Sequence, residues 1–289
     1  MSKVISFQIP KSQKEFIRFQ KDRGNHFYDK LHQHPQLQLT LILEGKGQFL
    51  SGDYVGRFEP GDIFFLGENV PHVFRSDPEY FEADSNLKAA GNTLFFDFQA
   101  LGDSILEVED LQGLRSLSQT KGACFQVSGA CRDRLTELIA EFESCNGLFR
   151  FQKGMEMLAV LEKAKDDLNA LNHAELNWGL SEKDGSRMDI ILRFLLENKN
   201  RTIRLEEAAS VASMSKEAFC RFFKLRTRKT FTQYLNQLRV NEALKLLEET
   251  ELGIAEIAFQ VGFENLSYFN RAFRKIQGET PSYFRRKRN

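Results

Sequence analysis

Hydrophobic and polar side chains alternate with a period of two from about residue 31 to residue 98. Successive side chains of a β-strand point to opposite faces, so this alternation predicts strands. The segment 36–43 shows it best, because leucines share one face while Gln36, Gln38 and Thr40 share the other. Further strands are expected at 48–51, 55–58, 63–66, 72–74 and 93–98, separated by turns containing Gly, Asp and Pro. Many short strands at short spacing predict a sandwich or a small barrel.

From about Gly129 the hydrophobic period changes to 3.6. Two amphipathic helices are expected over 129–170, separated by a break at Asn146-Gly147. Two interpretations of their apolar stripes remain open: the stripes close the core of their own domain, or part of them pairs with a second subunit. The polar stretch 171–186, which holds the single tryptophan, is interpreted as a linker.

The rest of the chain repeats itself at an offset of 50 residues. The offset aligns Ala208 with Ala258, Val211 with Val261, Ala212 with Gly262, Phe219 with Phe269, Arg221 with Arg271, Phe223 with Phe273, and Thr230 with Thr280. Each unit reads as a short helix, a tight turn and a second helix that begins after a capping residue, Ser215 or Asn265. The pattern predicts two helix-turn-helix units, near 205–225 and 255–276, joined by a helix over 231–249.

The second helix of each unit has one aromatic face, which must be core, and one polar face. The polar faces carry Glu217, Cys220, Arg221 and Lys224 in the first unit and Ser267, Asn270, Arg271 and Arg274 in the second. Arginine donates two hydrogen bonds to guanine and asparagine pairs with adenine, so these faces are expected to read base edges. Lys224 and Arg274, at the far ends, are better placed for phosphates.

Charge supports a nucleic-acid partner only once the chain is divided. The whole sequence has a net charge of zero, but residues 187–289 hold 20 basic and 12 acidic side chains, a net of +8, and residues 1–186 have a net of −8. This asymmetry predicts two domains, the second with a polyanionic partner.

Composition limits the remaining classes of protein. With 42% hydrophobic and 28% charged residues, disorder is excluded as the main state. There is no run of about 18 apolar residues and no secretory signal pattern, so we expect a cytoplasmic protein without a membrane contact. The cysteines form no C-x-x-C pair and are expected to be reduced, mostly in the core: Cys124, Cys131, Cys145 and Cys220.

The C-terminal segment resembles the DNA-binding domain of the AraC/XylS family of bacterial transcription regulators. The resemblance covers residues 187–289 and is closest from Ile254 through Phe273 to Pro281, which matches the family signature almost throughout. Arg228 departs from the pattern, since the first unit of the family usually has glycine there. The resemblance implies a sequence-specific transcription regulator, an effector-responsive activator that works with RNA polymerase on promoter DNA.

Three histidines point to a ligand site in the N-terminal half. Alternation places His32, His34 and Gln38 on one face, and His72 lies on a later strand. Their order resembles the two metal-binding motifs of cupin barrels, and the sensor domains of many AraC-type regulators are similar to cupins. Gln38 stands in the usual Glu position, and Gly67 and Asn69 replace the usual Pro and Gly.

Three imidazoles can hold a divalent metal, but the missing carboxylate favours a hydrogen-bonded effector pocket at His32, His34, Gln38 and His72, without a cofactor. Ordinary strand-end histidines remain the alternative.

The predicted organisation is a cupin-like all-β sensor barrel over 1–128, amphipathic helices over 129–170 that provide dimerisation, a linker over 171–186, and an all-α DNA-binding domain over 187–289. A metal-dependent cupin-type enzyme fused to a DNA-binding domain is the alternative function. It is not favoured, because the sequence shows metal ligands but no committed acid or base.

Overall fold

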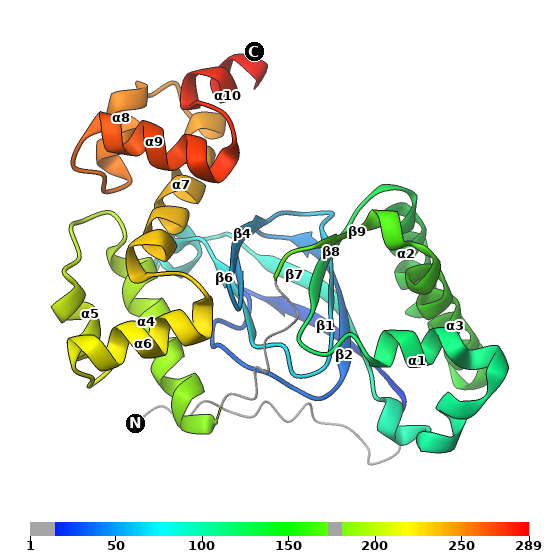
Figure 1. Cartoon of the computed structure of the whole chain (residues 1–289). Helices are drawn as coiled ribbons and strands as arrows, with labels where there is room; N and C mark the ends of the chain where they lie inside the picture. The colour runs from blue at the N-terminus through cyan, green and yellow to red at the C-terminus, as the bar shows by residue number, and fades with distance from the viewer. Residues whose placement is uncertain (1–14, 173–180, 289) are drawn as a thin grey trace. The chain divides into compact units, whose positions relative to one another are not determined.

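Six strands in the order β1-β7-β2-β5-β8-β9 form the larger of two antiparallel sheets, and three strands in the order β4-β3-β6 form the smaller (Figure 1). The larger sheet contains β1 (Ile17–Gly24), β2 (Leu37–Glu44), β5 (Ile63–Leu66), β7 (Ala89–Phe96), β8 (Cys124–Val127) and β9 (Leu168–Ala170). The smaller contains β3 (Gly47–Ser51), β4 (Tyr54–Phe58) and β6 (His72–Ser76). The computed structural model describes residues 15–172 and 181–288, and the chain divides into two units between Glu182 and Lys183.

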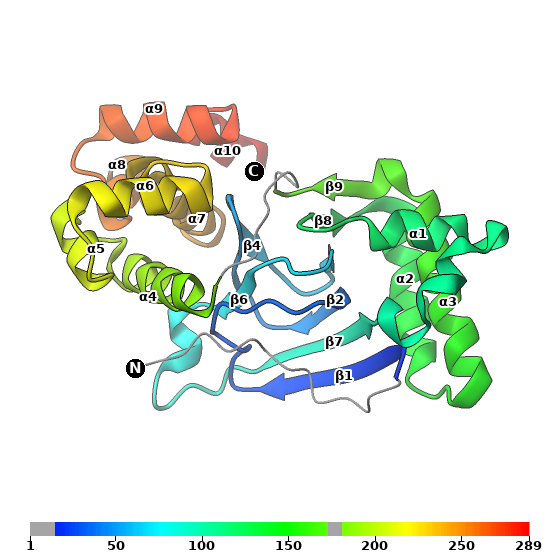
Figure 2. The ribbon, with the colours of Figure 1, turned by 60° about the horizontal axis from the view of Figure 1, so that its bottom comes forward.

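Both faces of β2 are buried, which explains its two surfaces. Leu37, Leu39 and Leu41 belong to a core shared with three helices, α1 (Gln112–Ser118), α2 (Gly129–Phe142) and α3 (Gly147–Lys163). These helices gather beside the larger sheet in both views (Figures 1 and 2). The opposite face carries Ile42 into a second core, an aromatic one between the two sheets. Gln38 and Thr40 share that inward face by alternation and are themselves buried, so polar groups lie inside the sheets.

The helical stripes close the core of their own unit. Their fully buried side chains, packed against the larger sheet, are Leu135, Leu138, Ile139, Phe142, Met157, Leu158 and Leu161. Leu148, expected within the second stripe, is instead 80% exposed, and Phe149 beside it is 73% exposed. Residues 168–170, expected in the helical region, form β9, which pairs with β8. The helical segment and the barrel are therefore one structural unit.

The first unit contains elements that the sequence pattern did not predict. These are β1, β8, β9 and α1, with five short 3-10 helices at Pro78–Phe81, Phe98–Ala100, Asp103–Glu107, Glu109–Leu111 and Lys165–Asp167. The strand expected at 93–98 runs instead from Ala89 to Phe96 and lies between β1 and β2.

Seven helices form the second unit. They are α4 (Glu182–Asn198), α5 (Leu205–Val211), α6 (Lys216–Thr227), α7 (Phe231–Glu249), α8 (Ile254–Gln260), α9 (Leu266–Gln277) and α10 (Pro281–Arg288). Helix α4 begins at Glu182, so residues 182–186, expected in the linker, are its first residues. Residues 173–180 of the expected linker lie outside the described residues. Within the part of the chain that the structure describes, no helix is long and apolar enough to cross a membrane.

The repeat has an offset of 50 in its second helices but of 49 in its first helices. Helices α6 and α9 differ by 50 residues at both ends, whereas α5 and α8 differ by 49. Ser213 and Gly262 are the equivalent turn residues, because both have positive φ, 53° and 95°. The alignment of Ala212 with Gly262 was therefore wrong by one position. The second turn contains one additional residue, Glu264.

Candidate functional site

The second helix of each helix-turn-helix unit is held by an aromatic core on one side. Phe219 and Phe223 of α6 are fully buried and contact the rings of Phe231 and Tyr234 on α7. Helix α9 is anchored in the same way: Phe269 contacts Phe263, and Phe273 contacts Phe284.

The capping residues that the sequence indicated fix the starts of these helices. The Ser215 side chain accepts from the Ala218 amide, and Asn265 accepts from the Tyr268 amide at 2.8 Å. A fixed start and a buried face set which side chains point outward.

All eight side chains predicted to read DNA lie on the exposed face of α6 or α9. They are Glu217, Cys220, Arg221, Lys224, Ser267, Asn270, Arg271 and Arg274. Arg271 also lies over the Tyr268 ring, 5.9 Å from its centroid, and the Tyr268 hydroxyl accepts from Asn236 of α7 at 2.6 Å. The structure thus brings each predicted set together on one helix face.

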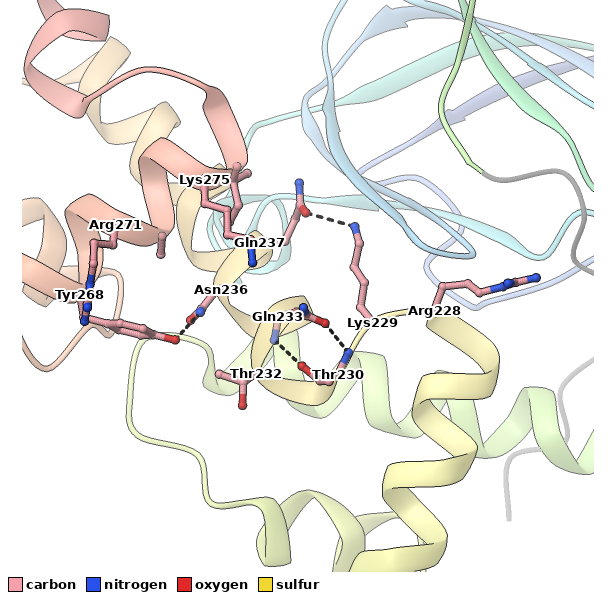
Figure 3. Close-up of a pocket in the computed structure, with 12 residues that line it drawn as sticks. Arg228, Lys229, Thr230, Thr232, Gln233, Asn236, Gln237, Tyr268, Arg271 and Lys275 are labelled. Atoms are coloured by element: carbon pink, nitrogen blue, oxygen red, sulfur yellow. Dashed lines mark hydrogen bonds between the residues drawn. The ribbon is translucent and has the colours of Figure 1, made fainter.

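A basic groove of about 650 Å³ lies beside this face (Figure 3). Four cationic side chains line it: Arg228, Lys229, Arg271 and Lys275. Sequence reasoning did not select Lys229 and Lys275. Lys275 was detectable, because it follows Arg271 by one helical turn. The groove extends the positive surface from α9 to the start of α7.

Arg228 occupies a backbone conformation that favours glycine. It caps the C-terminus of α6 with φ 53°, and its equivalent in the second unit, Gly278, caps α9 with φ 79°. The family's usual glycine at this position therefore has a conformational reason.

In the first unit, the three predicted histidines come together on one backbone scaffold. His32 and His72 exchange backbone hydrogen bonds of 3.1 and 2.9 Å, and the Asn69 amide donates to the His34 carbonyl at 2.8 Å. Asn69 has φ 57°, a conformation that asparagine tolerates better than most residues. A Cβ on Gly67 would lie 1.7 Å from the Thr120 carbonyl oxygen, so glycine is required there. Both departures from the cupin pattern are thus compatible with the local backbone.

We call His32, His34, His72 and Gln38 the histidine cluster. One ring nitrogen from each histidine lies within 4.8 Å of the other two. Burial lowers the pKa of all three imidazoles, that of His32 from 6.5 to about 4. Neutral imidazoles near pH 7 can accept hydrogen bonds or bind a metal.

A chain of buried polar groups leads away from this cluster across the larger sheet. Gln38 contacts His34 Nε2 at 2.8 Å on one side and donates to the Thr40 hydroxyl at 2.8 Å on the other. Thr40 contacts Thr93 at 3.2 Å, and Thr93 donates to the Asp22 carboxylate at 3.1 Å. Burial raises the pKa of Asp22. Polar side chains therefore line the inside of β2, β7 and β1.

A buried polar site in a β-sheet unit, followed by a basic unit with two exposed recognition helices, defines a two-domain transcription regulator. Sequence comparison agrees: residues 14–94 match the AraC-like ligand binding domain, and residues 208–287 match a helix-turn-helix domain. The chain belongs to the AraC family of helix-turn-helix transcription regulators. It is a regulator rather than the metal-dependent enzyme of the alternative interpretation.

Relatives align along most of this chain. The transcriptional activator RhaR of Cronobacter sakazakii is 30% identical over 260 residues, which cover 88% of this chain and 86% of RhaR. The Msm operon regulatory protein of Streptococcus mutans is 22% identical over 249 residues, 86% of this chain and 83% of that protein. Among solved structures, the DNA-binding domain of AdpA in complex with a target DNA is 29% identical, covers 34% of this chain and 87% of that one, and has a TM-score of 0.33.

Proposed function

We propose that this regulator binds promoter DNA in the cytoplasm through α6 and α9 and activates transcription with RNA polymerase when an effector occupies the histidine cluster. The observation that carries the proposal is the repeated exposed polar face on α6 and α9, each backed by buried phenylalanines, in a segment with a net charge of +8. RhaR, the relative with the same two-part organisation, is a transcriptional activator.

The residues divide by the part of DNA that they contact. Arg221 and Arg271, near the middle of their helices, donate to guanine edges, and Asn270 pairs with adenine. Lys224 and Arg274, one turn closer to the C-termini, contact phosphates. Helix α7 has 19 residues and is about 28 Å long, which suits recognition helices in major-groove segments about 34 Å apart.

A pair of neighbouring arginines tests this division of roles. We expect Arg271→Ala to cost about 1–3 kcal/mol on the preferred site and to relax specificity in its half of that site. Arg274→Ala should weaken binding to all sequences alike and lower the dependence of affinity on salt. Titrations of the full chain with specific and scrambled duplexes at several salt concentrations measure both. Uniform weakening by Arg271→Ala would contradict the assignment.

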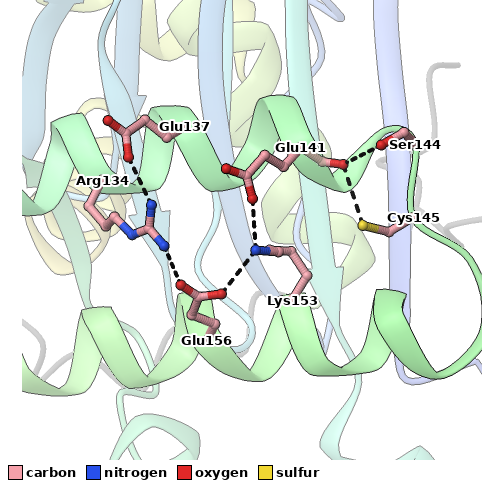
Figure 4. Close-up of polar contacts among 7 residues, drawn as sticks. All are labelled: Arg134, Glu137, Glu141, Ser144, Cys145, Lys153 and Glu156. Carbon is pink, nitrogen blue, oxygen red and sulfur yellow. Dashed lines mark hydrogen bonds and ion pairs between the residues drawn. The ribbon is translucent and has the colours of Figure 1, made fainter.

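We also propose a homodimer through the tip of the α2–α3 hairpin. The long sides of the two helices are joined by ion pairs: Arg134 to Glu137 and Glu156, and Lys153 to Glu141 and Glu156 (Figure 4). A partner covering these charges would have to desolvate them, which opposes association there. The tip instead exposes Leu148 and Phe149, whose burial would favour association.

Sedimentation of the full chain tests the dimer. Replacing both tip residues, Leu148→Ser and Phe149→Ser, should convert dimers to monomers without loss of helical content. Leu87→Ser, at an exposed leucine outside the hairpin, is the matched control and should leave the dimer intact. A monomeric wild-type chain, with and without DNA, would refute the dimer and leave DNA binding by the second unit untouched.

A further inference from the structure

His34 faces more oxygen atoms than its neutral ring can donate to. Its Nδ1 lies 3.1 Å from the Gln36 carbonyl oxygen, and its Nε2 lies 2.8 Å from Gln38 Oε1. A neutral imidazole carries a single N–H, and burial lowers the pKa of His34 so that the neutral form prevails. One lone pair of the ring is therefore directed at an oxygen, which is repulsive unless a cation lies against both atoms.

Turning the Gln38 amide over does not remove this conflict, because hydrogen-bond directions are set from the other end of the chain. Thr93 donates its hydroxyl hydrogen to Asp22. The 3.2 Å contact between Thr93 and Thr40 must then use the Thr40 hydrogen. Thr40 can only accept from Gln38, so the amide nitrogen of Gln38 faces Thr40 and its oxygen faces His34.

His72 presents a second unsatisfied nitrogen to the same place. Its Nδ1 lies 2.8 Å from the Val70 carbonyl oxygen, which only accepts, so Nδ1 carries the hydrogen and Nε2 the lone pair. His72 is 1% exposed, and its Nε2 has no hydrogen-bond partner among the described residues. The ring centroid of His72 lies 4.3 Å from that of His32 and 5.3 Å from that of His34.

We propose that the barrel binds one divalent transition-metal ion through a ring nitrogen of each of His32, His34 and His72, with Gln38 Oε1 as a fourth ligand. The ion supplies the positive charge that the facing atoms of His34 and Gln38 require, and it uses the unpartnered nitrogen of His72. Carbonyl contacts at the other ring nitrogen, such as that of His32 Nδ1 to Lys30 at 2.9 Å, orient the rings as in protein metal sites.

The spacing and ligand chemistry identify the class of ion. Three nitrogens within 4.8 Å of one another place a central point no more than about 2.8 Å from each, and Zn–N bonds are about 2.0–2.1 Å. Each ring must therefore move by less than about 1 Å. Imidazole-rich sites suit zinc, copper, iron and nickel rather than calcium or magnesium.

All four ligands are neutral, so the bound ion keeps its double charge and can bind an oxygen-donor or anionic effector. This step deepens the proposed function and rests on it only for the role of the ion in signalling; metal binding depends on the cluster alone.

The test uses the full chain, stripped of metal with a chelator and titrated with Zn²⁺ by calorimetry and with Co²⁺ by visible absorption. One ion per chain is expected. His34→Gln and His72→Gln should each lower Zn²⁺ affinity at least about 100-fold. Gln38→Glu should raise affinity about 10-fold and shift the Co²⁺ bands, because a carboxylate replaces the amide oxygen. Far-UV circular dichroism and DNA binding verify that each variant is folded.

His26→Gln is the matched control, since His26 is exposed and stacks on Phe81 outside the cluster. It should bind Zn²⁺ as the wild type does. The inference is overturned if the wild-type chain binds no ion, or if His34→Gln and His72→Gln bind as tightly as His26→Gln. A chain that binds DNA but no metal would leave the regulatory function standing, and a chain that binds metal but no DNA would refute the proposed function alone.

Discussion

Replacing Arg228 by glycine should stabilise the junction between α6 and α7. Arg228 has φ 53°, and a left-handed conformation costs an L-residue about 1–2 kcal/mol relative to glycine. Glycine returns part of this gain, about 0.4–1 kcal/mol, because it makes the unfolded chain more flexible. The expected net stabilisation is about 0.5–1 kcal/mol.

Gly278 provides the reverse experiment within the same chain. A Cβ at Gly278 would meet no atom within 4 Å, so Gly278→Ala changes the backbone energy without a steric clash. With φ 79°, this variant should lose about 0.5–1 kcal/mol at the end of α9. The two substitutions should therefore have opposite signs and similar sizes.

Hydrogen exchange of the full chain measures both effects locally. A change of about 0.5–1 kcal/mol corresponds to exchange about two- to fivefold slower at the end of α6 in Arg228→Gly, and correspondingly faster at the end of α9 in Gly278→Ala. Arg228→Ala keeps the Cβ and removes only the charge, so its exchange should match that of the wild type while its DNA affinity loses about 0.9 of salt dependence per phosphate contact. If Arg228→Gly exchanged as fast as Arg228→Ala, backbone strain at this cap would be excluded.

Three further predictions concern other parts of the chain. Iodoacetamide at pH 8 should modify exposed Cys220 but not Cys131, because burial raises the pKa of Cys131 to about 11, and bound DNA should protect Cys220 while Cys145 stays reactive; mass spectrometry detects either outcome, and unprotected Cys220 would contradict its place on the DNA-reading face. Phe273→Ala should destabilise the second helix-turn-helix unit by about 3–5 kcal/mol and abolish specific DNA binding, which denaturation and binding titrations measure; a fully stable variant would contradict its core role. Gly154→Leu should destabilise the first unit by about 1–3 kcal/mol, since even a Cβ there would lie 2.0 Å from an isoleucine methyl of β1; unchanged thermal unfolding of that unit would show that α3 does not pack this closely.

Sequence patterns were most informative where one element determines its own surface. The strands over Leu37–Glu44 and Ile63–Leu66 and the faces of α6 and α9 follow from local alternation or helical period. In contrast, β8 has only four residues, and β1 has a mostly polar sequence, so neither carries a readable period. Their place in the sheet depends on partners that are distant in the sequence.

The chemistry of the histidine cluster was only partly predictable. The three histidines and Gln38 could be selected from their spacing, but the sequence favoured a hydrogen-bonded pocket because the usual carboxylate is missing. The directions of the hydrogen bonds depend on Thr93, which lies opposite Thr40 in the register of β7 and β2, and on Asp22 in β1. Only the folded sheet brings these groups together.

The additional residue in the second turn, Glu264, means that the two helix-turn-helix units are not interchangeable modules. Its carboxylate accepts from the Thr202 hydroxyl at 2.8 Å, so the insertion is fastened to the segment that precedes α5. Helix α9 is therefore carried at a different position relative to α8 than α6 is relative to α5. A set of base-reading residues moved from one helix to the other would meet the duplex from a new angle. The vocabulary of each half of a target site thus belongs to its own unit, and an engineer would have to rewrite the turn together with the face.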